Sequence, residues 1–174
     1  MTELSRQQDH ILELLQRLDW PTTTSRKNVL NPGEDRYHGF ALGIVTSWAG
    51  KGDKAGYRKV ISLKTEKPKY KGLYEESKRL MTLKDPHFEY SSIQYNKNHV
   101  CAKHKDKLNQ GYSYIIGLGN YTGGELILYD EEGENPRLID IRDKFFKFDG
   151  SIYPHETAPF TGERFTLVFF STVH

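Results

Sequence analysis

The sequence predicts a mainly β fold, a sandwich or barrel of about eight short strands flanked by one to three helices. Three observations lead to this prediction. Short runs rich in β-branched and aromatic residues recur from residue 88 onward, Gly and Asp-Gly turn signals separate them, and helical spacing occurs only earlier. The chain of 174 residues is 13% aromatic, so we expect an aromatic-rich core. We predict one domain over 1–174, with a helix at 3–19 and a β core over about 88–172.

The first half of the chain contains the helical signals. Apolar residues recur at helical spacing over 3–19, and Pro21 ends this pattern because proline disfavours the helical conformation in its predecessor. We expect a loop over 22–36, which has little apolar content, and a strand over 40–48.

The segment 51–84 is strongly basic, with eleven Lys and Arg against four Asp and Glu, and tyrosines lie between the charges. Leu73, Ser77 and Leu80 have helical spacing, which predicts a second helix here. Two interpretations stay open. The charges either form a solvated surface or form a basic rim that attracts a polyanion, with aromatic rings that stack on bases.

The second half reads as a series of strands separated by polar or glycine-containing turns. Asp149-Gly150 is the clearest of these turn signals. The expected strands cover 88–96, 114–119, 125–129, 137–141, 144–148 and 164–170.

Candidate metal ligands occur at two distant positions in this β-rich half. Residues i and i+2 of a strand point to the same face, so His104 and Asp106 direct an imidazole and a carboxylate to one point. His155 would add a second imidazole, completing the facial triad typical of non-haem Fe(II) oxygenases. Arg164, nine residues later, has a guanidinium suited to binding a carboxylate. A double-stranded β-helix (jelly roll) suits a site whose ligands come from distant strands.

The ordered set of these motifs resembles the Fe(II)/2-oxoglutarate-dependent dioxygenase superfamily over residues 95–171. The motifs are His104-x-Asp106, then Gly123-Gly124-Glu125-Leu126, then His155 and Arg164. The resemblance implies a cupin-like jelly roll, Fe(II) as the metal, and 2-oxoglutarate and O2 as co-substrates, with ascorbate as a stimulant. It also implies that Arg164 binds the far carboxylate of 2-oxoglutarate, that Thr166 adds a hydroxyl to this contact, and that a substrate C–H bond is hydroxylated.

Three further residues are candidates for contacts with the co-substrate. Tyr95 lies nine residues before His104, and its phenol either hydrogen-bonds the co-substrate or belongs to the core. Asn109 and Ser113 follow the metal pair closely, and they either orient a ligand or shape a turn.

Several functional readings remain open. The triad would also suit zinc-dependent hydrolysis, although a hydrolase has no need of a carboxylate clamp at Arg164. A non-catalytic jelly roll used only for binding is another alternative.

Two branches of the superfamily differ in the substrate that they imply. The run His104-x-Asp106-x-x-Asn109-x-Gly111-x-Ser113 is similar to nucleobase oxygenases such as the thymine hydroxylases of the J-base pathway and the TET 5-methylcytosine oxidases. The separation of His155 and Arg164 is shorter than that branch usually shows. The separation of Tyr95 and His104, and the run Pro154-His155-Glu156-x-x-Pro159 followed by Arg164, resemble the prolyl hydroxylases instead. AlkB demethylases would need a second arginine on the last strand, which has none. We favour a nucleobase in nucleic acid, with a prolyl or other peptidyl side chain as the alternative.

Composition sets the expected location and partners. The formal net charge is only +2, the single Cys101 excludes an internal disulfide, and no apolar run approaches the ~18 residues of a membrane span. Residues 1–9 lack the apolar core of a signal peptide. We expect a soluble intracellular monomer, in cytoplasm or nucleus, that acts on a nucleic acid or a polypeptide and not on a membrane.

Overall fold

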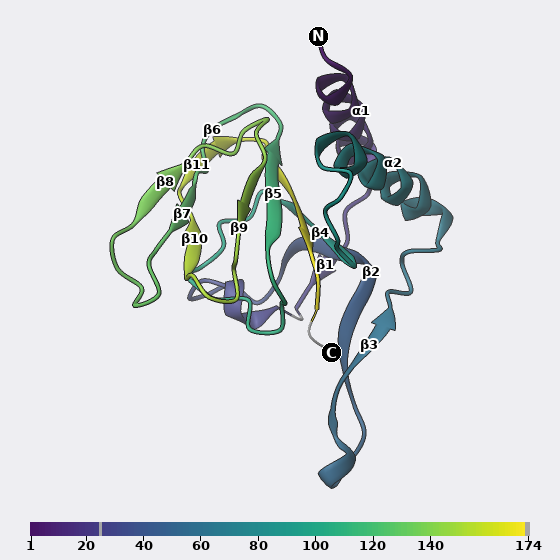
Figure 1. The fold of residues 1–174 in the computed structure, drawn as a ribbon, viewed down its shortest axis with the longest axis vertical. Coiled ribbons are helices and arrows are strands. Elements are labelled where there is room, and N and C mark those ends of the chain that lie inside the picture. The colour runs from purple at the N-terminus through teal and green to yellow at the C-terminus, as the bar shows by residue number, and fades with distance from the viewer. Residues whose placement is uncertain (25, 173–174) are drawn as a thin grey trace.

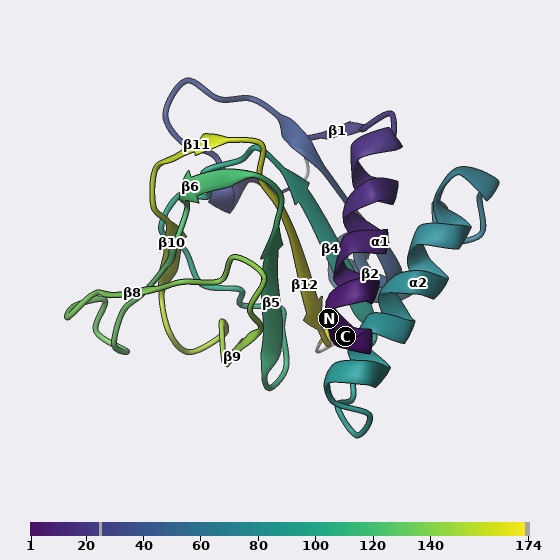
Figure 2. The same cartoon turned by 90° about the horizontal axis from the view of Figure 1, so that it is seen from above.

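A seven-stranded antiparallel sheet divides the molecule into two layers. In the computed structural model, which describes residues 1–24 and 26–172, two helices cover one face of this sheet. Smaller sheets lie on the side away from the helices (Figures 1 and 2). The main sheet has the order β1-β2-β4-β12-β5-β9, with β3 paired to β2, and the smaller sheets are β10-β7-β8 and β11-β6. The predicted mainly β class with flanking helices is therefore confirmed.

The elements of the first half are two α-helices, two short 3-10 helices and four strands. They are α1 (Glu3–Arg17), β1 (Thr22–Thr23), η1 (Lys27–Val29), β2 (Tyr37–Ala49), η2 (Gly52–Lys54), β3 (Gly56–Ile61), α2 (Pro68–Lys84) and β4 (Ser92–Lys97). The second half contains only strands among its regular elements. They are β5 (Ser113–Leu118), β6 (Tyr121–Gly123), β7 (Leu126–Leu128), β8 (Arg137–Ile139), β9 (Phe146–Phe148), β10 (His155–Thr157), β11 (Phe160–Gly162) and β12 (Phe165–Phe170).

Helix α1 begins and ends where local chemistry dictates. The Thr2 hydroxyl accepts a hydrogen bond from the Ser5 amide at 3.0 Å, which caps the first turn. Leu18 is already extended, two residues before Trp20, so the helix is slightly shorter than the predicted 3–19.

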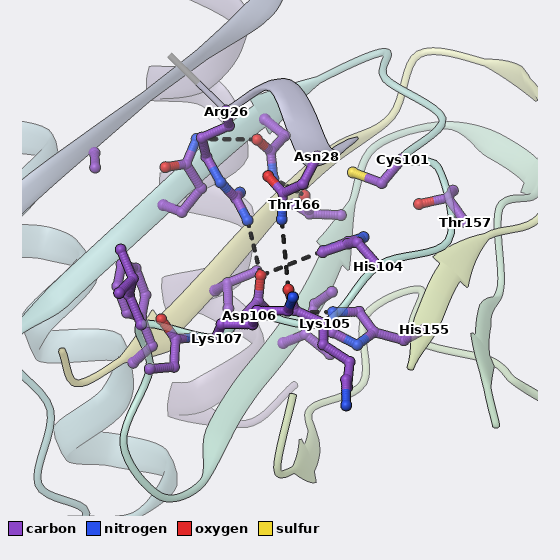
Figure 3. A pocket seen from close by; sticks show the side chains of 18 of the residues that line it. Arg26, Asn28, Cys101, His104, Lys105, Asp106, Lys107, His155, Thr157 and Thr166 are labelled. Atoms are coloured by element: carbon purple, nitrogen blue, oxygen red, sulfur yellow. Dashed lines mark hydrogen bonds and ion pairs between the residues drawn. The ribbon is translucent and has the colours of Figure 1, made fainter. Parts of the chain in front are cut away.

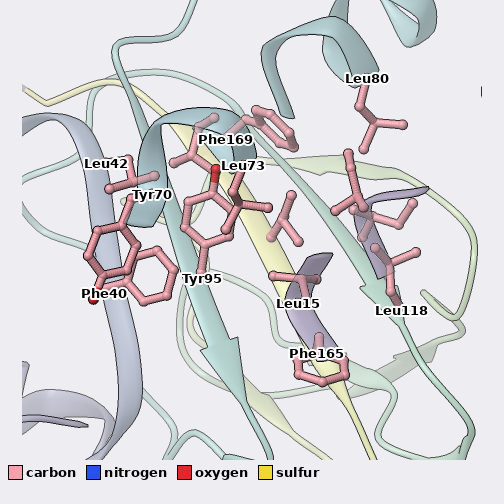
Figure 4. Close-up of a cluster of buried hydrophobic side chains, with 14 of the residues drawn as sticks. Leu15, Phe40, Leu42, Tyr70, Leu73, Leu80, Tyr95, Leu118, Phe165 and Phe169 are labelled. Carbon is pink, nitrogen blue, oxygen red and sulfur yellow. The ribbon is translucent and has the colours of Figure 1, made fainter. Parts of the chain in front are cut away.

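The main core lies between the helices and the sheet (Figure 4). Alternate residues of β12 point into it, and Tyr95 of β4 is fully buried in the same cluster. The largest buried contributors from the sheet are Phe40, Leu42, Ile93, Tyr95, Ile116, Leu118, Phe165, Leu167 and Phe169. A smaller cluster, containing Ile115, Leu126 and Phe148, packs on the opposite side of the sheet.

Strand β2 is longer than the predicted 40–48, and its outer half leaves the main sheet. Its pairing with β4 covers 38–43, whereas from Ile44 to Ala49 it pairs with β3. We call the paired segment 44–61 the projecting hairpin, because it extends away from the body of the molecule (Figure 1). The sequence did not predict β3. The expected loop at 22–36 is also incomplete, since it contains β1 and η1.

Among the described residues, neither α-helix combines the length and the apolar character that crossing a membrane would require.

Candidate active site

Backbone pairing brings the two candidate histidines together. His104 and His155 form an isolated antiparallel bridge, in which each amide donates to the other residue's carbonyl at 3.0 Å. Two residues after His104, the amide of Asp106 donates to the carbonyl of Gly150 at 2.8 Å. Two segments about fifty residues apart thus meet through main-chain hydrogen bonds.

The side chains of His104, Asp106 and His155 converge on one point (Figure 3). One potential ligand atom from each lies within 4.8 Å of the other two. His104 Nε2 is 3.3 Å from Asp106 Oδ1, and His155 Nε2 is 3.2 Å from Asp106 Oδ2.

The opposite ring nitrogens are already engaged with backbone carbonyls. Nδ1 of His104 is 2.6 Å from the carbonyl oxygen of Ala102, and Nδ1 of His155 is 2.9 Å from that of Tyr153. A carbonyl only accepts, so each Nδ1 donates its hydrogen there, and each Nε2 is turned toward the carboxylate of Asp106. The donor set of two imidazoles and one carboxylate therefore fits a divalent metal with nitrogen and oxygen ligands.

The Asp106 side chain is 12% exposed, and its charge is strongly stabilised. Burial by itself would raise the pKa of Asp106, but hydrogen bonds with His104 and His155 and the charge of Arg26 hold this pKa well below its usual range. The guanidinium of Arg26 lies 3.0 Å from Asp106 Oδ1 (Figure 3). The carboxylate is therefore ionised and available as a ligand.

Gly150 makes the close packing around these ligands possible. A Cβ atom at this position would lie 2.8 Å from Asp106 Oδ2 and 3.0 Å from the His155 ring. Any larger residue would push the carboxylate or the imidazole out of place.

The three side chains line a cavity of about 760 Å³, a size typical of small-molecule sites. Arg164 and Thr166 line the same cavity, and so do Asn109 and Arg26. Three lysines, Lys103, Lys105 and Lys107, alternate with the metal-ligand candidates along its wall.

Arg164 is a buried cation whose hydrogen-bonding capacity is only partly used. It is 3% exposed, and its Nη2 donates to the carbonyl of Gly124 at 2.9 Å. Its Nε has no hydrogen-bond partner, and it forms no ion pair with any residue that the structure describes. Burial lowers the pKa of Arg164, partly offset by Tyr121. A buried guanidinium without a counter-charge is costly, so the site fits an anionic ligand.

The backbone around Arg164 is shaped to receive its side chain. Asn98, in a left-handed conformation, accepts from the Arg164 amide and donates its own amide to the Arg164 carbonyl, both at 2.8 Å. Gly124 also has a positive φ of 66°, and a Cβ there would lie 2.7 Å from the Arg164 Nε. The Gly123-Gly124 motif therefore leaves room for the guanidinium.

Thr166 and Asn109 lie where the sequence suggested. Asn96 donates to the hydroxyl oxygen of Thr166 at 3.0 Å, which leaves the hydroxyl hydrogen free for another acceptor. Asn109 lines the cavity, and its amide donates to the carbonyl of Asp106 at 3.0 Å.

Two of the predicted co-substrate residues are not brought to the site. Tyr95 is fully buried on the helix side of the sheet, where its hydroxyl donates to the hydroxyl of Ser77 at 2.8 Å. The co-substrate role for Tyr95 is thus wrong, because odd-numbered residues of β4 face the helices. Ser113 is buried in β5 opposite Phe148 and does not line the cavity, so a direct contact with ligand is not supported.

Arg26 and Asn98 are site residues that sequence reasoning missed. Arg26 lies in the segment expected to be a plain loop, and only the tertiary fold brings it to Asp106. For Asn98, the residue type gave a weak signal, since asparagine tolerates positive φ better than most residues.

Comparison with known proteins gives a consistent picture of the fold. No family model matches the sequence, and no curated protein matches it. Solved structures do match. A 2OG-Fe(II) oxygenase family oxidoreductase from Burkholderia pseudomallei is 18% identical with a TM-score of 0.58, over 95% of this chain and 78% of that one. NgTET1 in complex with 5mC DNA is 16% identical with a TM-score of 0.58, over 97% and 68% of the two chains.

A third structural neighbour is a prolyl hydroxylase from Trichoplax adhaerens in complex with a hypoxia inducible factor peptide fragment. It is 16% identical with a TM-score of 0.53, over 97% of this chain and 78% of that one. The chain thus has the jelly-roll fold of 2OG-Fe(II) oxygenases, and the resemblance predicted from its motifs is confirmed at the level of fold.

Proposed function

We propose that this protein is an Fe(II)- and 2-oxoglutarate-dependent dioxygenase that hydroxylates a C–H bond of a nucleobase in nucleic acid. The observation that supports this proposal most strongly is the meeting of His104, Asp106 and His155 in a cavity that also contains the unpaired Arg164. A zinc hydrolase would give no role to that buried guanidinium.

His104 and His155 would hold the metal through Nε2, and Asp106 through a carboxylate oxygen. Backbone carbonyls fix both imidazoles, so the nitrogens that face the cavity are the ones able to bind a metal. Arg26 contacts Asp106 Oδ1 and keeps the carboxylate oriented. Ferrous iron with 2-oxoglutarate and O2 supplies the oxidising power for C–H hydroxylation when bound, while the protein supplies orientation and a shielded pocket.

Arg164 would bind the far carboxylate of 2-oxoglutarate, and Thr166 would donate its free hydroxyl hydrogen to the same group. Both residues lie on the cavity side of the sheet, two positions apart at the start of β12. The cationic wall also suits a dianionic co-substrate, because Arg26, Arg164 and three lysines outnumber Asp106 and Glu156 there.

A nucleic-acid substrate agrees with the charge near the cavity. Lys105 and Lys107 form no ion pair with the described residues, and the basic projecting hairpin contributes Val45, Thr46 and Tyr57 to the cavity wall. A cavity of about 760 Å³ lined by cations suits an enzyme that acts on an extruded or single-stranded nucleotide. A peptidyl substrate would need no such charge.

The proposal is tested by measuring succinate release from 2-oxoglutarate with added Fe(II). The candidate substrates are single-stranded DNA and RNA containing thymine or methylated bases, and proline-containing peptides. We expect succinate release that depends on iron and rises with an oligonucleotide. A rise with a peptide only would replace the nucleobase by a peptidyl side chain.

Variants of the metal ligands provide the second part of this test. His104→Ala and Asp106→Ala should abolish turnover and remain folded, since neither residue belongs to a hydrophobic cluster. The exposed His87 gives a matched control, and His87→Ala should keep wild-type turnover. Full succinate production by His104→Ala would contradict the metal assignment.

A further inference from the structure

The projecting hairpin is an extended surface that is largely exposed to solvent. Among the described residues, β2 beyond Gly43 pairs only with β3, and β3 pairs only with β2. Figure 1 shows this two-stranded ribbon reaching away from the sheets with η2 at its tip. An isolated two-stranded hairpin is at best marginally stable in water.

Two aromatic rings lie exposed on this ribbon, directly opposite each other. Trp48 is 62% exposed and Tyr57 is 42% exposed, and their ring centroids are 5.0 Å apart in an edge-to-face arrangement. The chain's other tryptophan, Trp20, is buried against Phe165 and donates to the carbonyl of Leu15. Trp48 therefore has no structural role comparable to that of Trp20.

Cations surround these rings. From residue 44 to 67 there are six Lys and Arg against two Asp and Glu. They are Lys51, Lys54, Arg58, Lys59, Lys64 and Lys67. None of them forms an ion pair with a residue in the described part of the chain, and Arg58 donates only to backbone carbonyls of the hairpin.

The hairpin is continuous with the cavity. Tyr57 belongs both to the exposed pair and to the cavity wall, beside Val45 and Thr46 at the base of the ribbon. The hydroxyl of Thr46 is buried there and has no hydrogen-bond partner within residues 1–24 and 26–172. Lys105 and Lys107 line the same cavity. A ligand lying along the ribbon would thus reach the cavity containing the candidate metal ligands.

We propose that the projecting hairpin binds single-stranded nucleic acid, with bases stacking on Trp48 and Tyr57 and phosphates contacting the hairpin cations. Base stacking on aromatic rings combined with a basic track is how proteins bind single strands without reading sequence. Binding of the strand to the hairpin is independent of the function proposed above. Delivery of a nucleotide from the bound strand to the cavity rests on that function.

Other occupants fit the surface less well. A second copy of the hairpin would bring two positively charged ribbons together, which is unfavourable. A duplex hides the faces of its bases, so the exposed rings would find nothing to stack on. Lysines on an edge strand can protect a protein against edge-to-edge pairing with another chain. The exposed rings of Trp48 and Tyr57 would favour such association, so protection does not explain this surface.

The test is titration of the full-length protein with a short oligothymidylate strand, followed by tryptophan fluorescence and by anisotropy of a labelled strand. We expect quenching, because a base stacks on the exposed Trp48 while Trp20 stays buried. Trp48→Ala should weaken binding about tenfold, which corresponds to about 1.4 kcal/mol. Leu138→Ala, an exposed apolar residue of β8, is the matched control and should bind as wild type.

Charge is tested separately by a triple variant, Lys51→Ser, Lys54→Ser and Arg58→Ser. Each phosphate contact contributes about 0.7 to the salt dependence for a single strand, so the slope of log K against log salt should fall by about 2. The matched triple variant Arg17→Ser, Lys71→Ser and Lys84→Ser removes exposed charges from the helices and should leave the slope unchanged.

Outcomes that would overturn the proposal are clear. They are wild-type affinity in both hairpin variants, equal affinity for a duplex of the same sequence, or tighter binding of an acidic peptide than of the oligonucleotide. His104→Ala should still bind the strand, because the proposed binding surface contains no metal ligand. Wild-type protein that binds the strand through the hairpin but releases no succinate would count against the dioxygenase proposal alone. Succinate release without hairpin-dependent binding would count against the proposed strand binding alone.

Discussion

The two faces of the main sheet carry different kinds of residue, although the same strands supply both. In β12, Phe165, Leu167 and Phe169 point to the helices and are fully buried in the main core. The alternating positions Thr166 and Val168 line the cavity with Arg164. Strand alternation therefore separates stability from ligand binding within one run of seven residues. Substitutions on the helix side should lower stability, and those on the cavity side should lower function.

The largest effect is expected from Phe165→Ala on the helix side. Removing this fully buried ring, which stacks on Trp20, should lower the free energy of unfolding by about 3–5 kcal/mol. Urea denaturation followed by circular dichroism measures this. Val168→Ala, in the same strand but on the cavity side, should lose clearly less, and equal losses would break the comparison.

Arg164→Ala should affect the co-substrate rather than the fold. The loss of one charged, hydrogen-bonded contact is worth about 1.5–3 kcal/mol, so the apparent KM for 2-oxoglutarate should rise roughly ten- to hundredfold. Succinate release at varied 2-oxoglutarate measures this, and Arg137→Ala on exposed β8 serves as the control. An unchanged KM would place the carboxylate clamp elsewhere.

Arg26→Met should show how Asp106 is held without metal. Removing the guanidinium 3.0 Å from Asp106 Oδ1 should destabilise the metal-free protein by about 1–2 kcal/mol. The difference should shrink on saturation with Mn(II), because the metal supplies the missing positive charge. Thermal unfolding with and without Mn(II) measures both, with Arg36→Met, whose side chain is exposed, as the control. If Mn(II) does not change the stability difference between wild type and Arg26→Met, Arg26 does not act through the metal site.

The smallest effect is expected from Tyr95→Phe. This substitution removes a buried hydrogen bond to Ser77 and should cost about 1 kcal/mol of stability, with no change in the KM for 2-oxoglutarate. Denaturation and succinate release together test both parts. A raised KM for 2-oxoglutarate with unchanged stability would indicate that the Tyr95 phenol contacts the co-substrate.

Sequence patterns predicted the parts of the molecule that depend on local periodicity. The alternation over 164–170 was informative, because one face of β12 packs against the main core and the other faces the cavity. The spacing of His104 and Asp106 was also informative, although both lie outside the regular strands and His104 forms only an isolated bridge with His155. Strand β3 gave no such signal. Most of the projecting hairpin is exposed to solvent, so Gly56–Ile61 has no alternation of buried residues and its sequence has the character of a basic surface.

The site was predictable where its residues form recognisable sequence motifs. Arg26 follows no pattern, since it comes from an irregular segment and reaches Asp106 over eighty residues of sequence. Tyr95 misled for a different reason. Its distance from His104 along the chain says nothing about which side of β4 it occupies, and that side is set by pairing with β2 and β12.

The reciprocal amide–carbonyl bonds between His104 and His155 have a practical consequence for working with this protein. Ligand segments that the main chain already fastens together do not have to fold around an ion, unlike those of small zinc domains. Chelation should leave a well-folded protein, and refilling with a redox-inert divalent ion should give a stable, silent form. Such a form would let substrates be trapped and crystallised before any oxidation occurs.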